Sequence, residues 1–125
     1  MPTAFAPATA VTMGEPAGVG IEITLKAWLR QEPALAPFFL IADVDEVSRC
    51  ATALDLDVPV ARIENVDGAA STFSTSLPVL HQPLPASSVP GSPDSTNAPA
   101  VLGAIETAVA LTMDRGANAV VTNPI

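Results

Sequence analysis

The stretch that decides the fold is Val11-Thr12-Met13-Gly14-Glu15-Pro16-Ala17-Gly18-Val19-Gly20-Ile21-Glu22. A short apolar run enters a turn that holds three glycines, one proline and one carboxylate, and an amphipathic segment follows directly. Glycine accepts a positive φ and lets other atoms approach its backbone, whereas proline fixes φ. A strand that feeds a helix through such a turn leaves the first N–H groups of the helix free to bind an anion or a polar ligand atom. The alternative interpretation is an ordinary strand-to-helix connection whose glycines serve only the turn.

A second informative stretch, Ala119-Val120-Val121-Thr122-Asn123-Pro124-Ile125, ends the sequence. Its apolar residues are typical of a buried strand, and they run into a Thr-Asn-Pro turn. In open α/β sheets the ligand lies in a crevice beyond the carboxyl ends of the strands. We therefore expect the sequence to stop where such a crevice begins, so that it holds only part of a binding site and of the fold.

Between these stretches, strands and helices alternate. Apolar runs predict strands over residues 9–13, 38–42, 58–63, 77–80 and 118–122. Helices are predicted over residues 20–31, after an Asp43 cap, and from Asn97 to Gly116, where the glycine would end the helix in the left-handed conformation. Strands separated by helices indicate an α/β fold with a mostly parallel sheet and right-handed crossovers.

The helix predictions include caps and buried faces. Asp43 and Glu46 have the spacing of a capping box, in which each side chain bonds the backbone near the other. Their acidity, with that of Asp45, suits the positive end of a helix dipole better than it suits a metal site. The larger apolar side chains predict the buried faces, namely Ile21, Leu25, Trp28 and Leu29 in the first helix and Val101, Ile105, Ala108, Val109 and Thr112 in the last.

Two connecting segments have no regular pattern. The Ser/Thr-rich segment 67–76 is predicted to be an exposed excursion from the sheet. The segment 82–99 is rich in proline and serine, which predicts a loop. Because the helix after it continues the alternating pattern, this loop is not expected to separate two domains, and residues 1–125 are treated as one unit.

Composition excludes several classes of partner. The net charge of −8, with only five basic residues, argues against binding to nucleic acid or to an anionic membrane surface. No apolar run approaches the roughly 18 residues that span a bilayer. The first ten residues lack the basic start of a secretory signal, and the single cysteine cannot form an internal disulfide. We therefore expect a cytoplasmic protein.

Few side chains suit catalysis. His81 is the only histidine, and beside a proline-rich loop it is predicted to be solvated rather than catalytic. One histidine cannot build a histidine-ligated metal site, and no Ser-His-Asp set is evident. Cys50 lies in a helical pattern with apolar neighbours, which predicts a small core residue. We therefore assign no catalytic residue and no metal ligand to this sequence.

Three motifs carry a resemblance to a known family. They are Met13-Gly14-Glu15-Pro16-Ala17-Gly18-Val19-Gly20, then Asn97-Ala98-Pro99-Ala100 with Ile105-Glu106 after it, and finally Val121-Thr122-Asn123-Pro124-Ile125. The sequence resembles the N-terminal part of the 4-hydroxythreonine-4-phosphate dehydrogenase family across nearly its whole length. The family usually has proline where this sequence has Ile21, which alters the start of the helix and leaves the Gly-Glu-Pro-Ala-Gly core intact.

The resemblance implies an NAD-dependent oxidoreductase of pyridoxine biosynthesis. Family members oxidise 4-phosphooxy-L-threonine to 2-amino-3-oxo-4-phosphooxybutanoate, which loses carbon dioxide to give 3-amino-2-oxopropyl phosphate. The resemblance also implies a cytoplasmic homodimer with a divalent metal (zinc, magnesium or cobalt) held by three histidines. These histidines and the residues that hold the substrate phosphate would lie beyond Ile125. The implied fold is similar to that of isopropylmalate dehydrogenase, which lacks the G-x-G-x-x-G fingerprint, and no such fingerprint occurs here.

Because both loops follow strands of one parallel sheet, whose ends converge on the crevice, six residues are expected to line the active-site crevice of the full-length enzyme: Gly14, Glu15, Gly18, Gly20, Thr122 and Asn123. The isolated 125 residues are expected to be inactive, since the metal ligands would be absent. Two alternatives remain open, a non-catalytic α/β module and a sister dehydrogenase that acts on another phosphorylated hydroxy acid or a cyclic diol carboxylate.

Overall fold

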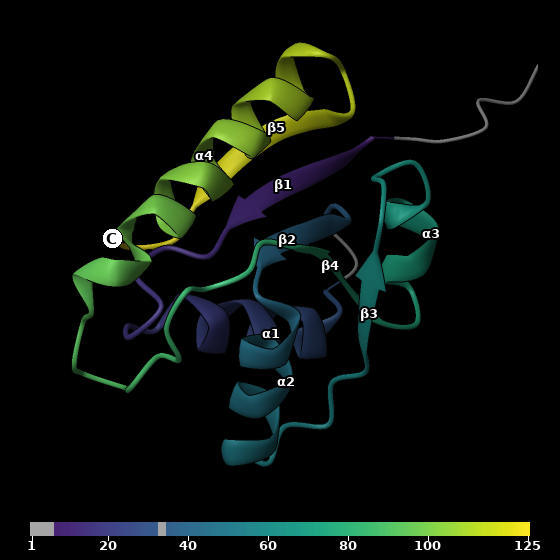
Figure 1. Ribbon diagram of the computed structural model, residues 1–125. Helices are drawn as coiled ribbons and strands as arrows, with labels where there is room; N and C mark the ends of the chain where they lie inside the picture. Colours follow the sequence, from purple (N-terminus) through teal and green to yellow (C-terminus); the bar gives the residue numbers. More distant parts are fainter. Residues whose placement is uncertain (1–6, 33–34) are drawn as a thin grey trace, which may run out of the picture.

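The computed structural model describes residues 7–32 and 35–125 of the chain. Strands and helices alternate along it, as Figure 1 shows. The strands are β1 (Ala8–Thr12), β2 (Phe38–Ala42), β3 (Val60–Ile63), β4 (Leu77–His81) and β5 (Ala117–Thr122). The helices are α1 (Gly20–Arg30), α2 (Val44–Ala53), α3 (Ala69–Phe73) and α4 (Ala98–Met113), with a 3₁₀ turn η1 (Ser95–Asn97) before α4.

The five strands form one sheet in the order β3-β4-β2-β1-β5, and every neighbouring pair is parallel. Right-handed crossovers place α1 and α2 on one face of this sheet and α3 and α4 on the other. Figure 1 shows α1 and α2 below the sheet and α4 above it. The predicted α/β class and the parallel sheet are therefore confirmed.

The core centres on β2, whose five residues are all buried. β2 lies between β1 and β4, with helices on both faces, so neither face of the strand meets water. A strand in this position favours apolar residues throughout its length, because each side chain packs against a covered face of the sheet. The predicted strand 38–42 is confirmed at both ends.

α1 confirms most of its predicted face. Ile21, Leu25 and Trp28 are buried, and the Trp28 indole donates a hydrogen bond of 2.9 Å to the Phe73 carbonyl. Leu29, by contrast, is 38% exposed, so its place on the buried face was wrong. The helix ends at Arg30, because Gln31 adopts the left-handed conformation with φ 46°.

α2 begins as predicted at Asp43, whose carboxylate accepts hydrogen bonds from the backbone N–H groups of Asp45 and Glu46. The second half of the capping box is not formed. Glu46 instead directs its carboxylate to Arg49 and to Ser88 in the loop before α4. Tertiary contacts thus replace the local bond.

The segment 67–76 contains a short helix, α3, so the prediction of an exposed excursion was wrong. Ala69 and Phe73 lie one helical turn apart and are both buried. The Phe73 ring meets the Phe38 ring edge-on at 4.8 Å between centroids. Ser71 and Thr72 precede Phe73 within a Ser/Thr-rich segment, so the periodicity argument missed this two-point apolar face.

α4 confirms only part of its predicted face, because Val101 and Ala108 are buried as predicted but the rest of the buried face differs. Its buried residues are Ala100, Val101, Ala104 and Ala108, whereas Val109 is 48% exposed. Small side chains let the helix approach β1 and β5 closely, and a face drawn through the larger side chains misses this alanine stripe.

The end of α4 also differs from the prediction. Arg115, not Gly116, adopts the left-handed conformation with φ 65°. The Gly116 N–H group then closes the helix with a 2.7 Å bond to the Leu111 carbonyl, as in a Schellman motif.

Among the described residues, no helix combines the length and the apolar character that a membrane crossing requires.

Candidate functional site

The loops after β1 and β5 meet at the carboxyl edge of the sheet. β1 and β5 are neighbours, with Thr12 opposite Thr122. α1 leaves the carboxyl end of β1 on one face of the sheet, and α4 enters β5 from the other face. Open α/β sheets bind their ligands in a crevice beyond the carboxyl ends of their strands.

Asn123 joins the two loops. Its side chain is 8% exposed, and its amide nitrogen donates to the Thr12 carbonyl and to the Thr24 hydroxyl, both at 3.0 Å. The Thr24 hydroxyl in turn donates to the Gly20 carbonyl at 2.8 Å. The end of β5 is therefore bonded to the end of β1 and to the first turn of α1.

Two of the glycines are needed for this contact. Gly14 has φ +70°, and a Cβ atom built on it would lie 2.4 Å from the Pro124 carbonyl oxygen. A Cβ atom on Gly20 would lie 2.4 Å from the Met13 carbonyl oxygen and 2.8 Å from the Asn123 Cβ. Both separations are far inside van der Waals contact, so any side chain would push the two loops apart.

Glu15 bonds within its own loop. One oxygen of its half-buried carboxylate accepts the Ala17 N–H at 2.9 Å, and its own N–H donates to the Pro124 carbonyl at 2.9 Å. Gly18 is exposed, and its N–H donates to the Glu15 carbonyl at 2.9 Å. α1 follows without any side-chain cap on its first N–H groups. The N–H groups of Glu15, Ala17 and Gly18 are thus used within the site, and they hold the Glu15 carboxylate in place beside the uncapped start of α1.

Of the six residues expected at the crevice, the structure brings Gly14, Gly20 and Asn123 into mutual contact. Glu15 and Gly18 lie on the same loop, and Thr122 is exposed at the end of β5. Thr24 is a member of this network that the sequence analysis missed. Its only signal was a hydroxyl one helical turn after Gly20, a common position for a bond to the carbonyl four residues back.

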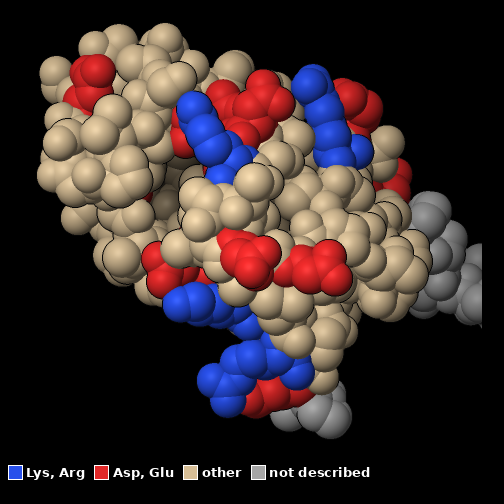
Figure 2. All heavy atoms as spheres, turned by 90° about the horizontal axis from the view of Figure 1, so that it is seen from below, with Lys and Arg blue, Asp and Glu red and all other residues tan. Residues whose placement is uncertain are grey.

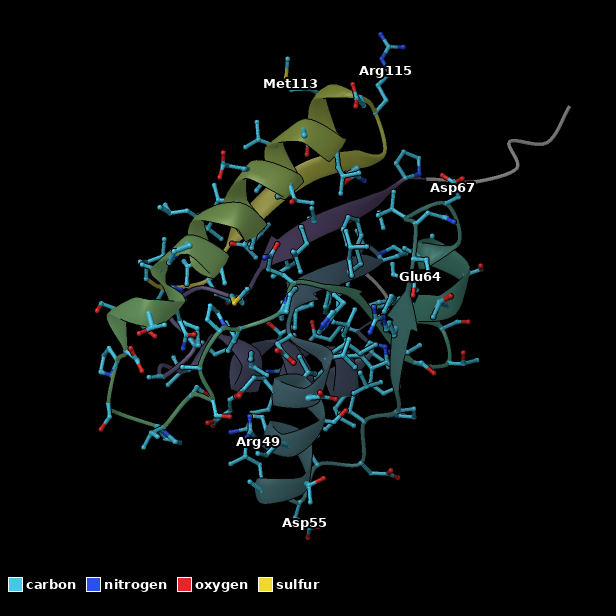
Figure 3. The ribbon with its side chains drawn as sticks, viewed as in Figure 1. Arg49, Asp55, Glu64, Asp67, Met113 and Arg115 are labelled. Carbon is cyan, nitrogen blue, oxygen red and sulfur yellow. The ribbon has the colours of Figure 1, made fainter. Side chains whose placement is uncertain are left out.

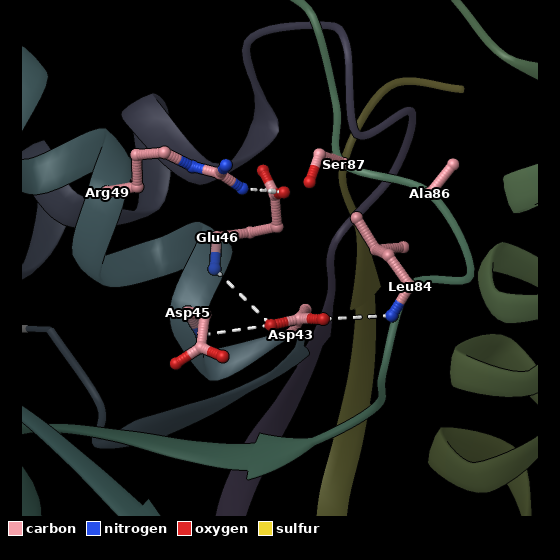
Figure 4. A pocket seen from close by; sticks show the side chains of 7 residues that line it. All are labelled: Asp43, Asp45, Glu46, Arg49, Leu84, Ala86 and Ser87. Carbon is pink, nitrogen blue, oxygen red and sulfur yellow. Dashed lines mark hydrogen bonds and ion pairs between the residues drawn. The ribbon is translucent and has the colours of Figure 1, made fainter.

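A second polar cluster follows β2 and β4. The Asp43 carboxylate accepts the Leu84 N–H at 2.9 Å, and Glu46 accepts both the N–H and the hydroxyl of Ser88. Asp43, Glu46 and Leu84 line a cavity of about 350 Å³, together with Asp45, Arg49, Ala86 and Ser87 (Figure 4). The proline-rich loop is therefore fastened to the first turns of α2.

His81 belongs to this cluster, so its prediction as a solvated loop residue was wrong. It is the last residue of β4, and its Nδ1 accepts the Val44 N–H at 3.1 Å. The imidazole serves α2 as an additional acceptor near its first turn. No local pattern could indicate this bond, because it joins residues 37 positions apart.

A second cavity, of about 340 Å³, lies between the glycine-rich loop and the helices α1 and α2. Its walls include Pro16, Gly18, Ile21 and Cys50. Cys50 packs against the core as predicted, but it is only half-buried and also faces this cavity. Burial and the nearby Glu22 carboxylate raise the pKa of the Cys50 thiol, so the thiol stays protonated.

The described residues offer no metal centre. No three histidine, cysteine, aspartate or glutamate side chains lie together in residues 7–32 and 35–125 so as to hold an ion. The carboxylates that do gather, Asp43 and Glu46, are occupied by backbone donors, Ser88 and Arg49. A catalytic metal does not fit this donor set.

Comparison with known proteins found no matching family model. Curated relatives do match, and each is called 4-hydroxythreonine-4-phosphate dehydrogenase. The one from Methylorubrum populi is 48% identical over 93% of this chain and 34% of its own length. The relative from Bradyrhizobium diazoefficiens is 43% identical over 93% of this chain and 36% of its own length.

Solved structures show the same fold. The crystal structure of a 4-hydroxythreonine-4-phosphate dehydrogenase from Burkholderia phymatum superposes with a TM-score of 0.83 at 23% identity, over 94% of this chain and 36% of that one. A putative enzyme of the same name from Salmonella typhimurium gives 0.79 at 23% identity, over 95% of this chain and 38% of that one. This chain spans about a third of the length of the curated relatives that it matches, and over that third it belongs to the 4-hydroxythreonine-4-phosphate dehydrogenase family.

Proposed function

We propose that this chain supplies one wall of the active-site crevice of an NAD-dependent, divalent-metal-dependent dehydrogenase that oxidises 4-phosphooxy-L-threonine. The wall consists of Gly14, Glu15, Gly18 and Gly20 on one loop and of Thr122 and Asn123 after β5. The product, 2-amino-3-oxo-4-phosphooxybutanoate, would decarboxylate to 3-amino-2-oxopropyl phosphate on the route to pyridoxine in the cytoplasm. The working enzyme is proposed to be a homodimer.

One observation carries this proposal. The two motifs of the family resemblance, 13–20 and 121–125, are about a hundred residues apart in sequence, yet they contact each other at the carboxyl edge of the sheet. Structural needs account for Gly14, Gly20 and Asn123. The Glu15 carboxylate uses one oxygen to bind the Ala17 N–H within the loop, and its second oxygen suits the orientation of a polar substrate at the same edge.

The metal and the NAD would be bound by residues outside this chain, because the described residues form no metal-ligand set. When bound, the metal would polarise the substrate alcohol and NAD would accept its hydride. The chain's own part is to hold the loop in place, position the Glu15 carboxylate at the crevice and direct the uncapped first N–H groups of α1 toward it.

A chimera tests the proposal. Residues 1–125 replace the matching third of the Methylorubrum populi relative, and reduction of NAD is followed with 4-phosphooxy-L-threonine and zinc, magnesium or cobalt. We expect turnover by the chimera and none by the 125-residue chain alone. A folded chimera without activity on this substrate would contradict the proposal. Activity only on another phosphorylated hydroxy acid or on a cyclic diol carboxylate would favour a sister dehydrogenase, and none on any would favour a non-catalytic module.

A further inference from the structure

The outer side of α4 is apolar. In its 16 residues α4 has one charged side chain, Glu106. Leu102, Val109 and Met113 are 60%, 48% and 78% exposed. With Glu106 they recur at helical spacing (i, i+4, i+7, i+11), which puts all four in one stripe opposite the buried alanines. Figure 3 shows Met113 pointing away from the body of the protein.

β5 beside it is an unusual edge strand. In the described part of the chain it pairs only with β1, and its sequence Ala-Asn-Ala-Val-Val-Thr carries no charge and no proline. Val121 is 51% exposed. Edge strands that face water are normally protected by charge or by shortness. β5, at six residues, has neither protection.

The opposite edge of the sheet provides an internal comparison. β3 has four residues, and its Arg62 forms an ion pair of 3.2 Å with Glu64 just beyond the strand. Figure 2, seen from below, shows basic and acidic side chains close together on the face of α1 and α2. There Lys26 pairs with Glu22 at 2.7 Å. Single apolar side chains are exposed elsewhere too, for example Ile23 and Val89. On α4, however, three of them share one stripe beside the uncharged edge strand β5.

From these features we infer that Leu102, Val109, Met113 and Val121, called here the α4–β5 face, form a docking surface for the rest of a family member's polypeptide. The curated relatives are about three times as long as the region that they share with this chain, so enough polypeptide exists to cover the surface. The occupant adds a strand to the free edge of β5 and lays apolar side chains along α4. It places a basic or hydrogen-bond-donating group opposite Glu106.

A second copy of the chain is the weaker occupant. Glu106 lies near the middle of the stripe, so two-fold antiparallel pairing of α4 with itself would bring two Glu106 carboxylates close together between apolar side chains. Burial of like charges in this way opposes association. The inference rests on membership of the family and not on the proposed chemistry, and its test does not measure turnover.

Cysteine labelling tests the inference. In a Cys50→Ser background, Met113→Cys in the 125-residue chain is expected to react with a maleimide about as fast as Val89→Cys, whose position is 58% exposed in a distant loop. In the full-length Methylorubrum populi relative, a cysteine at the position aligned with Met113 is expected to react about tenfold or more slowly than in urea, since local opening must precede the reaction.

Equal labelling of the aligned cysteine in folded and urea-unfolded relative would overturn the inference. Protection of Met113→Cys in the short chain that rises with protein concentration would also overturn it, because the occupant would then be a second copy. Should the cysteine variant fail to fold, hydrogen exchange on the unmodified proteins decides. Peptides covering Ala117–Thr122 are expected to exchange quickly in the short chain and slowly in the full-length relative, and equal exchange would count against the docking surface.

Discussion

Replacement of Gly14 by alanine is expected to cost more stability than replacement of any other glycine compared here. Two separate penalties apply at this position. A φ of +70° strains an alanine backbone by about 1 kcal/mol. The new Cβ would also lie 2.4 Å from the Pro124 carbonyl oxygen, and overpacking against backbone costs about 1–3 kcal/mol. We expect a combined loss of about 3 kcal/mol, or a melting temperature lower by about 10 °C for a chain of this size.

Three further glycines separate these penalties. Gly20→Ala meets the Met13 carbonyl oxygen at 2.4 Å without a positive φ, Gly91→Ala has φ +77° with nothing within 4 Å, and Gly68→Ala has neither problem. The expected losses fall in that order, from about 2 through about 1 to roughly 0 kcal/mol. Urea unfolding at low protein concentration measures them, with the single, buried Trp28 as the fluorescent reporter.

The comparison of Gly14→Ala with Gly91→Ala is decisive. Both carry the φ penalty, and only Gly14 faces the turn after β5. If the two variants lose the same stability, the glycine-rich loop does not press against that turn, and the packing described here is wrong.

Asn123→Ala removes two buried hydrogen bonds and should cost about 2 kcal/mol in urea unfolding. Asn118→Ala, in β5, removes two hydrogen bonds that are exposed and should cost under about 0.5 kcal/mol, and equal losses would argue against the role given to Asn123. Asp43→Ala removes the α2 cap and a bond to the proline-rich loop, a loss of about 1–2 kcal/mol; exposed Asp45→Ala is its control and should cost less. The raised pKa of Cys50 predicts that its alkylation rate rises at higher pH in the folded chain than in urea. The unfolded chain then ionises first as the pH rises, so the thiol favours unfolding under alkaline conditions, and identical rate profiles in both states would refute this.

The sequence predicted the elements whose signal is local. Phe38–Ala42 is a continuous apolar run, and Asp43 precedes the first turn of α2, so the strand and the cap could both be read from neighbouring residues. The alternation of such elements was enough for the parallel sheet. The predictions that were wrong concern residues whose structure depends on contacts between segments distant in the sequence.

Phe73, His81 and Glu46 illustrate this difference. Phe73 is helical and buried because it packs on Phe38 and receives the Trp28 indole, neither of which a Ser/Thr-rich window shows. His81 and Glu46 accept bonds from Val44 and Ser88, which the fold alone brings near.

The position of the candidate site could be predicted from the sequence because its signal is also local. Its two loops carry rare residue combinations, Gly-Glu-Pro-Ala-Gly and Thr-Asn-Pro, at the ends of strands that the topology makes neighbours. Sequence could place them at one edge of the sheet. It could not show that Gly14 and Gly20 are required by the Asn123–Pro124 turn, because that depends on a fit of a few ångströms between backbones.

Glu15→Gln in the chimera tests the central claim, that the glycine-rich loop forms part of the catalytic crevice. The glutamine oxygen can still accept the Ala17 N–H, which keeps the loop bond while removing the charge. The account predicts a loss in kcat/KM of at least about tenfold, or about 1.4 kcal/mol, with the melting temperature nearly unchanged. Unchanged kinetics together with a lower melting temperature would contradict it and leave the loop as a structural turn.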